Sequence, residues 1–112
     1  MKKIELLIRP EKLEDVKEVL NALDINGMTV TSVMGCGSQK GLTENYRGVA
    51  YHINLLPKIK VETVVTDEMV GKVIENVTEK LRSGKIGDGK IFVSNVSDAY
   101  RVRTGDNGEE AL

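Results

Sequence analysis

The chain has 112 residues, of which 40% are hydrophobic and 29% are charged, so it fits one globular domain rather than a disordered or fibrous class. Its formal net charge of −1 argues against broad nucleic-acid binding, and its one cysteine, Cys36, excludes an intramolecular disulfide framework. The first residues are strand-like and lack the apolar stretch of a secretion signal, and no run approaches about 18 apolar residues, so we expect a cytoplasmic protein.

The first part of the chain predicts a strand, a helix and a second strand. Apolar side chains alternate through residues 2–9, which is typical of a strand with one buried face. Pro10 suits the first turn of a helix, and apolar residues recur every three to four positions over residues 11–23, so we expect an amphipathic helix there. Residues 28–33 are rich in β-branched side chains and predict the second strand.

Residues 35–50 contain several glycines and no apolar period of either kind. A structureless stretch of this length in a compact domain is usually a functional loop, which could wrap a ligand, insert into a partner or present a hydroxyl group for modification. A period of two resumes at Ile53 and continues to Val65, which predicts a long third strand. Pro57 has no N–H to donate, so this strand should lie at a sheet edge or contain a bulge there.

The last part of the chain predicts a second helix and two more strands. Thr66 has the character of an N-cap, and an apolar stripe follows it until Gly84 stops the helix. We expect a fourth strand at about residues 90–96 and a short strand at about residues 99–104. The remaining tail is polar and acidic.

Two strand–helix–strand halves of similar size predict a ferredoxin-like α/β (α+β) sandwich of the order βαββαβ, with both helices on one face of an antiparallel sheet. Such a sheet keeps a second face without helices. The outward positions on that face are too apolar to remain in water, so we expect the chain to form oligomers through it; they include Leu7, Val33, Leu56 and Val64.

The segment from Gly84 to Ile91 matches part of a phosphate-binding P-loop. Ile91 replaces the Ser or Thr that would hold magnesium, and the order helix–loop–strand is the reverse of a P-loop, so we reject that reading. Glycines that let backbone N–H groups approach a phosphate still remain, with Lys90 as a point charge. The alternative is a simple turn with solvated lysines.

Arg101 and Arg103 are two residues apart, which on a strand would place both side chains on one face about 7 Å apart. Two adjacent like charges favour an anion or a pair of carboxylates, and the alternative is two solvated arginines. From Arg82 to Arg103 there are five basic residues and two acidic ones. A local positive site on a nearly neutral chain favours a small anionic ligand over a polymer.

No catalytic set is apparent. His52 has no serine or cysteine partner at a motif spacing, and Cys36 is more simply a structural thiol. An enzyme alternative, a small nucleotide-dependent transferase that uses the same anion site, therefore lacks a base and a nucleophile. Residues 90–93 are faintly similar to an RNA-binding motif, but two of its aromatic positions are absent and the net charge is wrong.

Seven stretches together identify a family: Met1-Lys2-Lys3-Ile4, Gly27-Met28-Thr29-Val30-Thr31, Gln39-Lys40-Gly41, Tyr46-Arg47-Gly48, Leu56-Pro57-Lys58, Gly84-Lys85-Ile86-Gly87-Asp88-Gly89-Lys90-Ile91-Phe92-Val93 and Arg101-Val102-Arg103-Thr104-Gly105. They closely resemble the PII signal transduction family of nitrogen regulators. The resemblance covers essentially the whole chain, and the last two stretches are highly specific together.

This resemblance implies a non-enzymatic homotrimer that binds ATP or ADP in clefts between subunits. One set of residues would cradle the phosphates: Gly87, Asp88, Gly89 and Lys90. Arg101 and Arg103 would reach the phosphates from the neighbouring chain. Other residues would line the adenosine side and the base of the long loop: Thr29, Gly35, Gly37, Ser38, Gln39 and Val64. Ser38 stands where many members carry an arginine that contacts the γ-phosphate.

The resemblance also implies a second effector, 2-oxoglutarate, with Mg²⁺. Gln39 would ligate the metal together with ATP and the keto acid, and Lys58 would pair with a carboxylate of 2-oxoglutarate. The residues for this effector would be Gln39, Lys40, Gly41 and Lys58. A metal that bridges phosphates and keto acid makes the two ligands bind synergistically, and ADP lacks the γ-phosphate for this.

The resemblance divides the single domain, residues 1–112, into functional segments: a mobile T-loop at 37–55, a phosphate-binding loop at 82–90, and a C-terminal loop and tail at 102–112. The T-loop would dock on an ammonium transporter or on enzymes and regulators of nitrogen metabolism. The only membrane contact would be peripheral, through the transporter, and no nucleic acid is implied. Tyr51 stands at the position that is uridylylated in some members.

Overall fold

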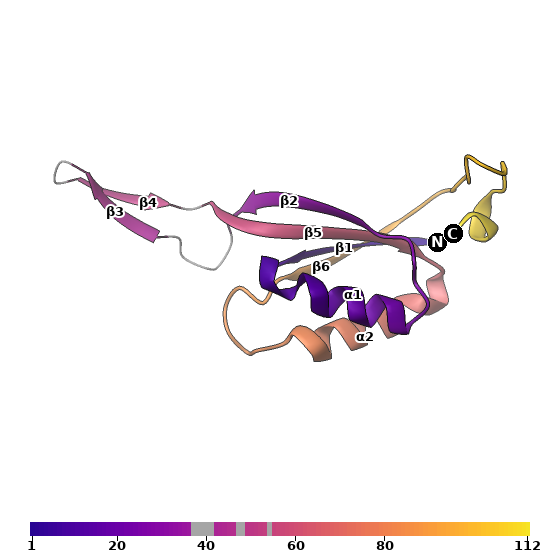
Figure 1. Ribbon diagram of the computed structural model, residues 1–112, viewed down its shortest axis with the longest axis horizontal. Coiled ribbons are helices and arrows are strands. Elements are labelled where there is room, and N and C mark those ends of the chain that lie inside the picture. Colours follow the sequence, from indigo (N-terminus) through magenta and orange to yellow (C-terminus); the bar gives the residue numbers. More distant parts are fainter. Residues whose placement is uncertain (37–41, 47–48, 54) are drawn as a thin grey trace.

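Figure 1 shows the computed structural model of the chain, which describes residues 1–36, 42–46, 49–53 and 55–112, with the backbone alone for 42–46 and 49–53. The main body consists of β1 (Lys2–Ile8), α1 (Leu13–Ala22), β2 (Thr29–Gly35), β5 (Leu56–Val65), α2 (Asp67–Leu81) and β6 (Lys90–Asn95). Between β2 and β5 stand β3 (Leu42–Tyr46) and β4 (Val49–Ile53), and 3-10 turns occupy Pro10–Lys12 and Gly108–Ala111.

The main sheet has the strand order β2-β5-β1-β6, and all its neighbours are antiparallel. Helices α1 and α2 lie side by side on one face of this sheet (Figure 1). The predicted ferredoxin-like α+β sandwich is therefore confirmed. The predicted first helix is confirmed as well, with its first turn wound as the 3-10 turn that begins at Pro10.

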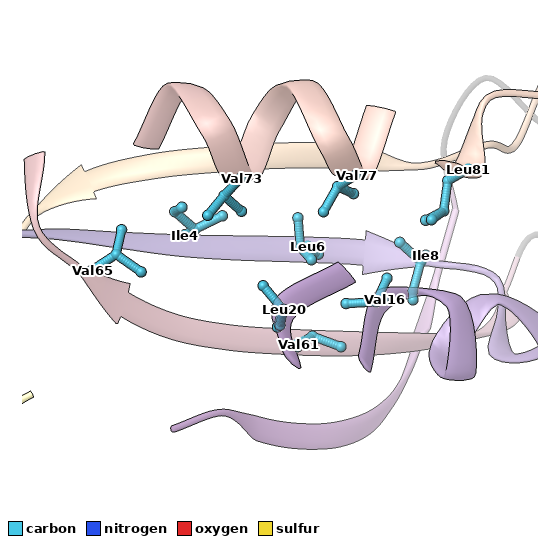
Figure 2. Packing of buried hydrophobic residues seen from close by; sticks show 10 residues of the cluster. All are labelled: Ile4, Leu6, Ile8, Val16, Leu20, Val61, Val65, Val73, Val77 and Leu81. Carbon is cyan, nitrogen blue, oxygen red and sulfur yellow. The ribbon is translucent and has the colours of Figure 1, made fainter. Parts of the chain in front are cut away.

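The core lies between this sheet and the two helices. Alternate residues of β1 are buried and point toward the helices, because successive strand side chains face opposite sides of a sheet (Figure 2). The helices add residues three to four positions apart, which lie on one helix face. The buried apolar cluster consists of Ile4, Leu6, Ile8, Val16, Leu20, Val61, Val65, Val73, Val77 and Leu81.

The segment predicted to lack regular structure contains a hairpin, so that prediction was wrong in part. β3 and β4 pair antiparallel from Leu42 opposite Ile53 to Tyr46 opposite Val49. They form a two-stranded sheet of their own, which extends beyond the end of the main sheet (Figure 1). A ribbon of this kind is held by its backbone hydrogen bonds and needs no apolar period. The third predicted strand consequently begins later, at Leu56.

The position of β5 corrects the inference from Pro57. β5 is an inner strand between β2 and β1, and it pairs in unbroken register, with Pro57 opposite Met34 of β2. The pairing with β1 ends at Ile8 opposite Ile59, before Pro57 is reached. At Pro57, therefore, β5 pairs with β2 only. The missing N–H of the proline removes no hydrogen bond to β1, because β1 does not extend that far.

The strand predicted at residues 99–104 is absent from the structure. The chain instead turns back on itself, with a single bridge between Tyr100 and Asn107. The Arg101 N–H donates to the Asp106 carbonyl at 2.8 Å, and the Gly105 N–H donates to the Arg101 carbonyl at 2.7 Å. These local hydrogen bonds satisfy the backbone without a strand partner. The strand-face argument for Arg101 and Arg103 is therefore wrong.

The other face of the main sheet carries no helix (Figure 1). By the strand register it holds the predicted outward residues, which are half-buried in the single chain: Leu7, Val33, Leu56 and Val64. Among the described residues, no helix is long and apolar enough to span a bilayer.

Candidate functional site

A cavity of about 530 Å³ lies where the end of the main sheet meets the loop between α2 and β6. Its volume is within the range of pockets that hold small ligands. The lining comes from the ends of β1 and β2, the starts of β5 and β6 and the loop itself: Leu7, Val33, Met34, Gly35, Cys36, Leu56, Lys58, Lys85, Ile86, Gly87, Asp88, Gly89, Lys90 and Phe92.

The charges around this cavity favour an anionic ligand. Three of its lining residues are basic, namely Lys58, Lys85 and Lys90, and one is acidic, Asp88. The Asp88 carboxylate is engaged within the loop, where it accepts hydrogen bonds from the N–H groups of Ser83 at 2.8 Å and Gly84 at 3.1 Å and from the Ser83 hydroxyl. Three lysines against this one carboxylate give the lining an excess of positive charge.

Hydrogen bonding also controls the charge state of Asp88. The bond from the Ser83 hydroxyl, followed by the Ser83 N–H, holds the pKa of the Asp88 carboxyl below its ordinary value. Asp88 is thus an anion that closes the loop. It could contact a phosphate through its backbone N–H, but its carboxylate would repel one.

Glycines shape the backbone of the loop between α2 and β6. Gly87 and Gly89 have φ values of +97° and +116°, in the region where side chains are strongly disfavoured. A Cβ atom on Gly89 would lie 2.3 Å from the carbonyl oxygen of Leu7. The loop backbone therefore lies directly against β1, which no other residue type allows.

Arg9 is a residue of this region that sequence reasoning missed. Its Nη2 donates to the Ile86 carbonyl at 2.7 Å, and its Nη1 lies 3.5 Å from Asp88 Oδ1. Arg9 and Asp88 are 79 positions apart, so no local pattern could reveal the contact. The sequence shows only an arginine directly before Pro10, which is indistinguishable from a solvated arginine at the end of any strand.

The structure brings together only part of the predicted nucleotide site. Gly35 joins Gly87, Asp88, Gly89, Lys90 and Lys58 around the cavity. Thr29 and Val64 lie farther along the sheet, since they pair with Glu62 and Lys3, whereas the cavity is at the end that carries Leu7 and Gly35.

The predicted arginines belong to the segment that follows β6, and this segment lies at the opposite end of the main sheet from the loop between α2 and β6 (Figure 1). β6 runs along the sheet from Lys90 to Asn95, away from the cavity. Directly after it, the Val96 N–H donates to the Met1 carbonyl at 3.1 Å, which places this part of the chain beside the start of β1. Arg101 donates to the Leu112 carbonyl at 3.1 Å and lies 3.8 Å from Asp106 Oδ2. Arg103 is exposed and pairs with no carboxylate among the described residues. One chain therefore cannot place these arginines on a ligand in its own cavity.

Several predicted residues lie outside the described part of the chain: Gly37, Ser38, Gln39, Lys40 and Gly41. Tyr51 is described in its backbone alone, within β4 and opposite Glu44. Among the described residues, no group of three His, Cys, Asp or Glu side chains could hold a metal ion. The predicted Mg²⁺ ligand, Gln39, stays a prediction.

Comparison with known proteins places these features in a family. The family model described as "Nitrogen regulatory protein P-II" matches residues 1–106. The chain belongs to the P-II family. The homotrimer expected for this fold is consistent with that family.

Relatives and a solved structure agree with this assignment. A nitrogen regulatory protein P-II of Haemophilus influenzae is 54% identical over 112 residues, with both chains fully covered. Nitrogen regulatory protein P-II 2 of Methanothermobacter thermautotrophicus is also 54% identical, over all of this chain and 97% of the relative. The structure of B. subtilis GlnK superposes with a TM-score of 0.81 at 39% identity, over 99% of this chain and 97% of that one.

These comparisons decide the class of function. The relatives are named as regulatory proteins, so this P-II protein takes part in nitrogen signal transduction and is not an enzyme. The transferase alternative is excluded by the same finding.

Proposed function

We propose that this P-II protein senses adenine nucleotides and 2-oxoglutarate in clefts between the subunits of a homotrimer. The observation that carries the proposal is the separation of its two anion-binding parts. The glycine loop of the lysine-lined cavity precedes β6 at one end of the sheet, and the segment that carries Arg101 and Arg103 follows β6 at the other end (Figure 1). A second copy can bring its arginines to the cavity of the first, which one chain cannot do for itself.

In this arrangement, ATP or ADP places its phosphates on the loop. The N–H groups of Gly87, Asp88 and Gly89 would donate to the phosphate oxygens, and Lys90 would add a point charge. Arg101 and Arg103 of the neighbouring subunit would complete the positive surround and hold phosphate oxygens in a planar fork. The adenosine side and the base of the T-loop would be lined by Thr29, Gly35, Gly37, Ser38, Gln39 and Val64.

The second effector, 2-oxoglutarate, would bind next to the phosphates. Lys58 lines the same cavity as the loop, so a carboxylate paired with it would adjoin the nucleotide. The backbone at Lys40 and Gly41 would contribute further contacts, and Gln39 would ligate Mg²⁺ between ATP and the keto acid. Keto-acid binding would then require the nucleotide and the metal together.

The output would pass through the T-loop, residues 37–55. Its β3–β4 hairpin extends beyond the end of the main sheet, as a segment that inserts into a partner would (Figure 1). The partner would be an ammonium transporter, met at the cytoplasmic membrane surface, or an enzyme or regulator of nitrogen metabolism. Tyr51 lies in β4 of this hairpin and is the candidate modification site.

Isothermal titration calorimetry tests this proposal. We expect ATP and ADP to bind, and 2-oxoglutarate to bind only when Mg²⁺ and ATP are both present. No binding of 2-oxoglutarate in the presence of Mg²⁺-ATP would refute keto-acid sensing. No binding of either nucleotide would refute the proposed site as a whole.

A further inference from the structure

The Arg9 side chain, directly after β1, binds the loop between α2 and β6. Arg9 Nη2 donates to the Ile86 carbonyl at 2.7 Å, and Arg9 Nη1 lies 3.5 Å from Asp88 Oδ1. The two side chains of the ion pair are 21% and 24% exposed, so solvent screens them only in part. One guanidinium thus holds a backbone carbonyl and a carboxylate of the same loop.

The side of this loop that faces α2 is not tightly packed. A cavity of about 160 Å³ lies between the loop and the end of α2, and its lining includes Val77 and Leu81 of α2 and Asp88 and Gly89 of the loop. The loop residues from Ser83 to Ile86 are exposed. Because this hollow provides no packing on that side, polar bonds add to the contact of Gly89 with Leu7 in fixing the loop.

Arg9 and Asp88 divide this task. Asp88 closes the loop on itself through Ser83 and Gly84. Arg9 attaches the closed loop to β1, beside the point where Gly89 meets Leu7. Arg9 does not line the larger cavity, so it would act on a ligand only through the loop.

We propose that Arg9 is a positioning residue, which holds the loop so that its N–H groups and Lys90 face the phosphates of a bound nucleotide. The inference rests on the proposed nucleotide site. Without Arg9, the loop would sample further positions in the cavity between it and α2. Nucleotide binding would then have to order the loop, which would weaken the affinity.

Two measurements on the full-length chain test this role. The first is amide hydrogen exchange of residues 83–89 without ligand, and the second is the affinity for ADP by calorimetry. Arg9→Met keeps the aliphatic part of the side chain and removes the guanidinium fork. We therefore expect severalfold faster amide exchange in the loop and an affinity for ADP that is weaker by roughly fivefold or more. Arg9→Lys keeps the charge but not the fork, so both values should lie between those of Arg9→Met and the wild type.

Lys12→Met is the matched control. Lys12 is three residues after Arg9, and its side chain does not reach the loop, so this variant removes one positive charge without removing a contact to the loop. It should leave both measurements unchanged. Equal weakening by Lys12→Met and Arg9→Met would assign the effect to long-range charge and overturn the inference. Wild-type exchange or wild-type ADP affinity in Arg9→Met, with ADP binding intact in the wild type, would overturn it too. Failure of the wild-type chain to bind ADP would overturn the proposed function and the inference with it.

Discussion

Gly89 and Leu7 are in such close contact that a Cβ atom on Gly89 would lie 2.3 Å from the Leu7 carbonyl oxygen. This contact helps to set the position of the loop between α2 and β6 against β1. Because both partners are backbone, no side-chain rotation can relieve a clash there.

Gly89→Ala should therefore both destabilise the fold and weaken nucleotide binding. Left-handed strain and overpacking together predict a loss of about 2–4 kcal/mol in the free energy of unfolding. Urea unfolding measures this loss, and calorimetry measures the affinity for ADP. Gly84→Ala is the matched control, since Gly84 has φ +80° but nothing within 4 Å of its built Cβ, so it should lose only about 1 kcal/mol. Equal losses in the two variants would contradict the importance of the Leu7 contact.

Lys90 and Arg103 should act from different subunits. Lys90→Met and Arg103→Ala should each weaken ATP binding, because each removes a positive group from every cleft. Arg103→Ala should leave the free energy of unfolding nearly unchanged, since Arg103 is exposed. When the two variants are unfolded together and refolded, each mixed trimer should regain one intact cleft. Titration with ATP would detect this as a fraction of tight sites absent from either variant alone. No recovery in mixed trimers would contradict a cleft shared between subunits.

The hydrogen bonds to Asp88 should make stability depend on acid pH. The pKa of Asp88 in the folded chain lies below its ordinary value of 3.8, so the unfolded state takes up the proton first as the pH falls. The stabilisation by Asp88 is present above the ordinary pKa and is lost as the pH falls through the lowered one. Asp88→Asn has no such proton, so its deficit in the free energy of unfolding should shrink between about pH 5 and pH 3. Urea unfolding across this range measures the difference, and a deficit constant with pH would be inconsistent with these hydrogen bonds.

Gly71 offers a stabilising substitution away from the site. It lies within α2, is exposed, and a Cβ atom on it would meet nothing within 4 Å. Gly71→Ala should raise the free energy of unfolding by about 0.5–1 kcal/mol, because alanine loses less backbone entropy than glycine in a helix. The midpoint of urea unfolding reports the change, with ADP affinity as the control that should not move. A lower midpoint would show that the helix face at Gly71 is covered in the assembled protein.

Local pattern was sufficient for the elements of the main body. The alternation of Ile4, Leu6 and Ile8 and the helical spacing of Val73, Val77 and Leu81 each reflect a face that packs on the core. Pattern failed in two other segments. The strands β3 and β4 pair through their backbones, and the segment at 99–104 satisfies its backbone through local turns, so neither structure depends on an apolar period.

The sequence by itself determined the fold class and the family, and it predicted an anion-binding loop, because periodicity and glycine–lysine spacing are properties of neighbouring residues. Only the tertiary structure decided that Pro57 belongs to an inner strand and that Asp88 closes its own loop. It alone also revealed Arg9 at that loop, and it showed that the segment with Arg101 lies at the other end of the sheet from the loop (Figure 1). These facts depend on which distant segments come into contact. The pairing of β1 with β5 and β6 determines those contacts, and no local sequence pattern encodes that pairing.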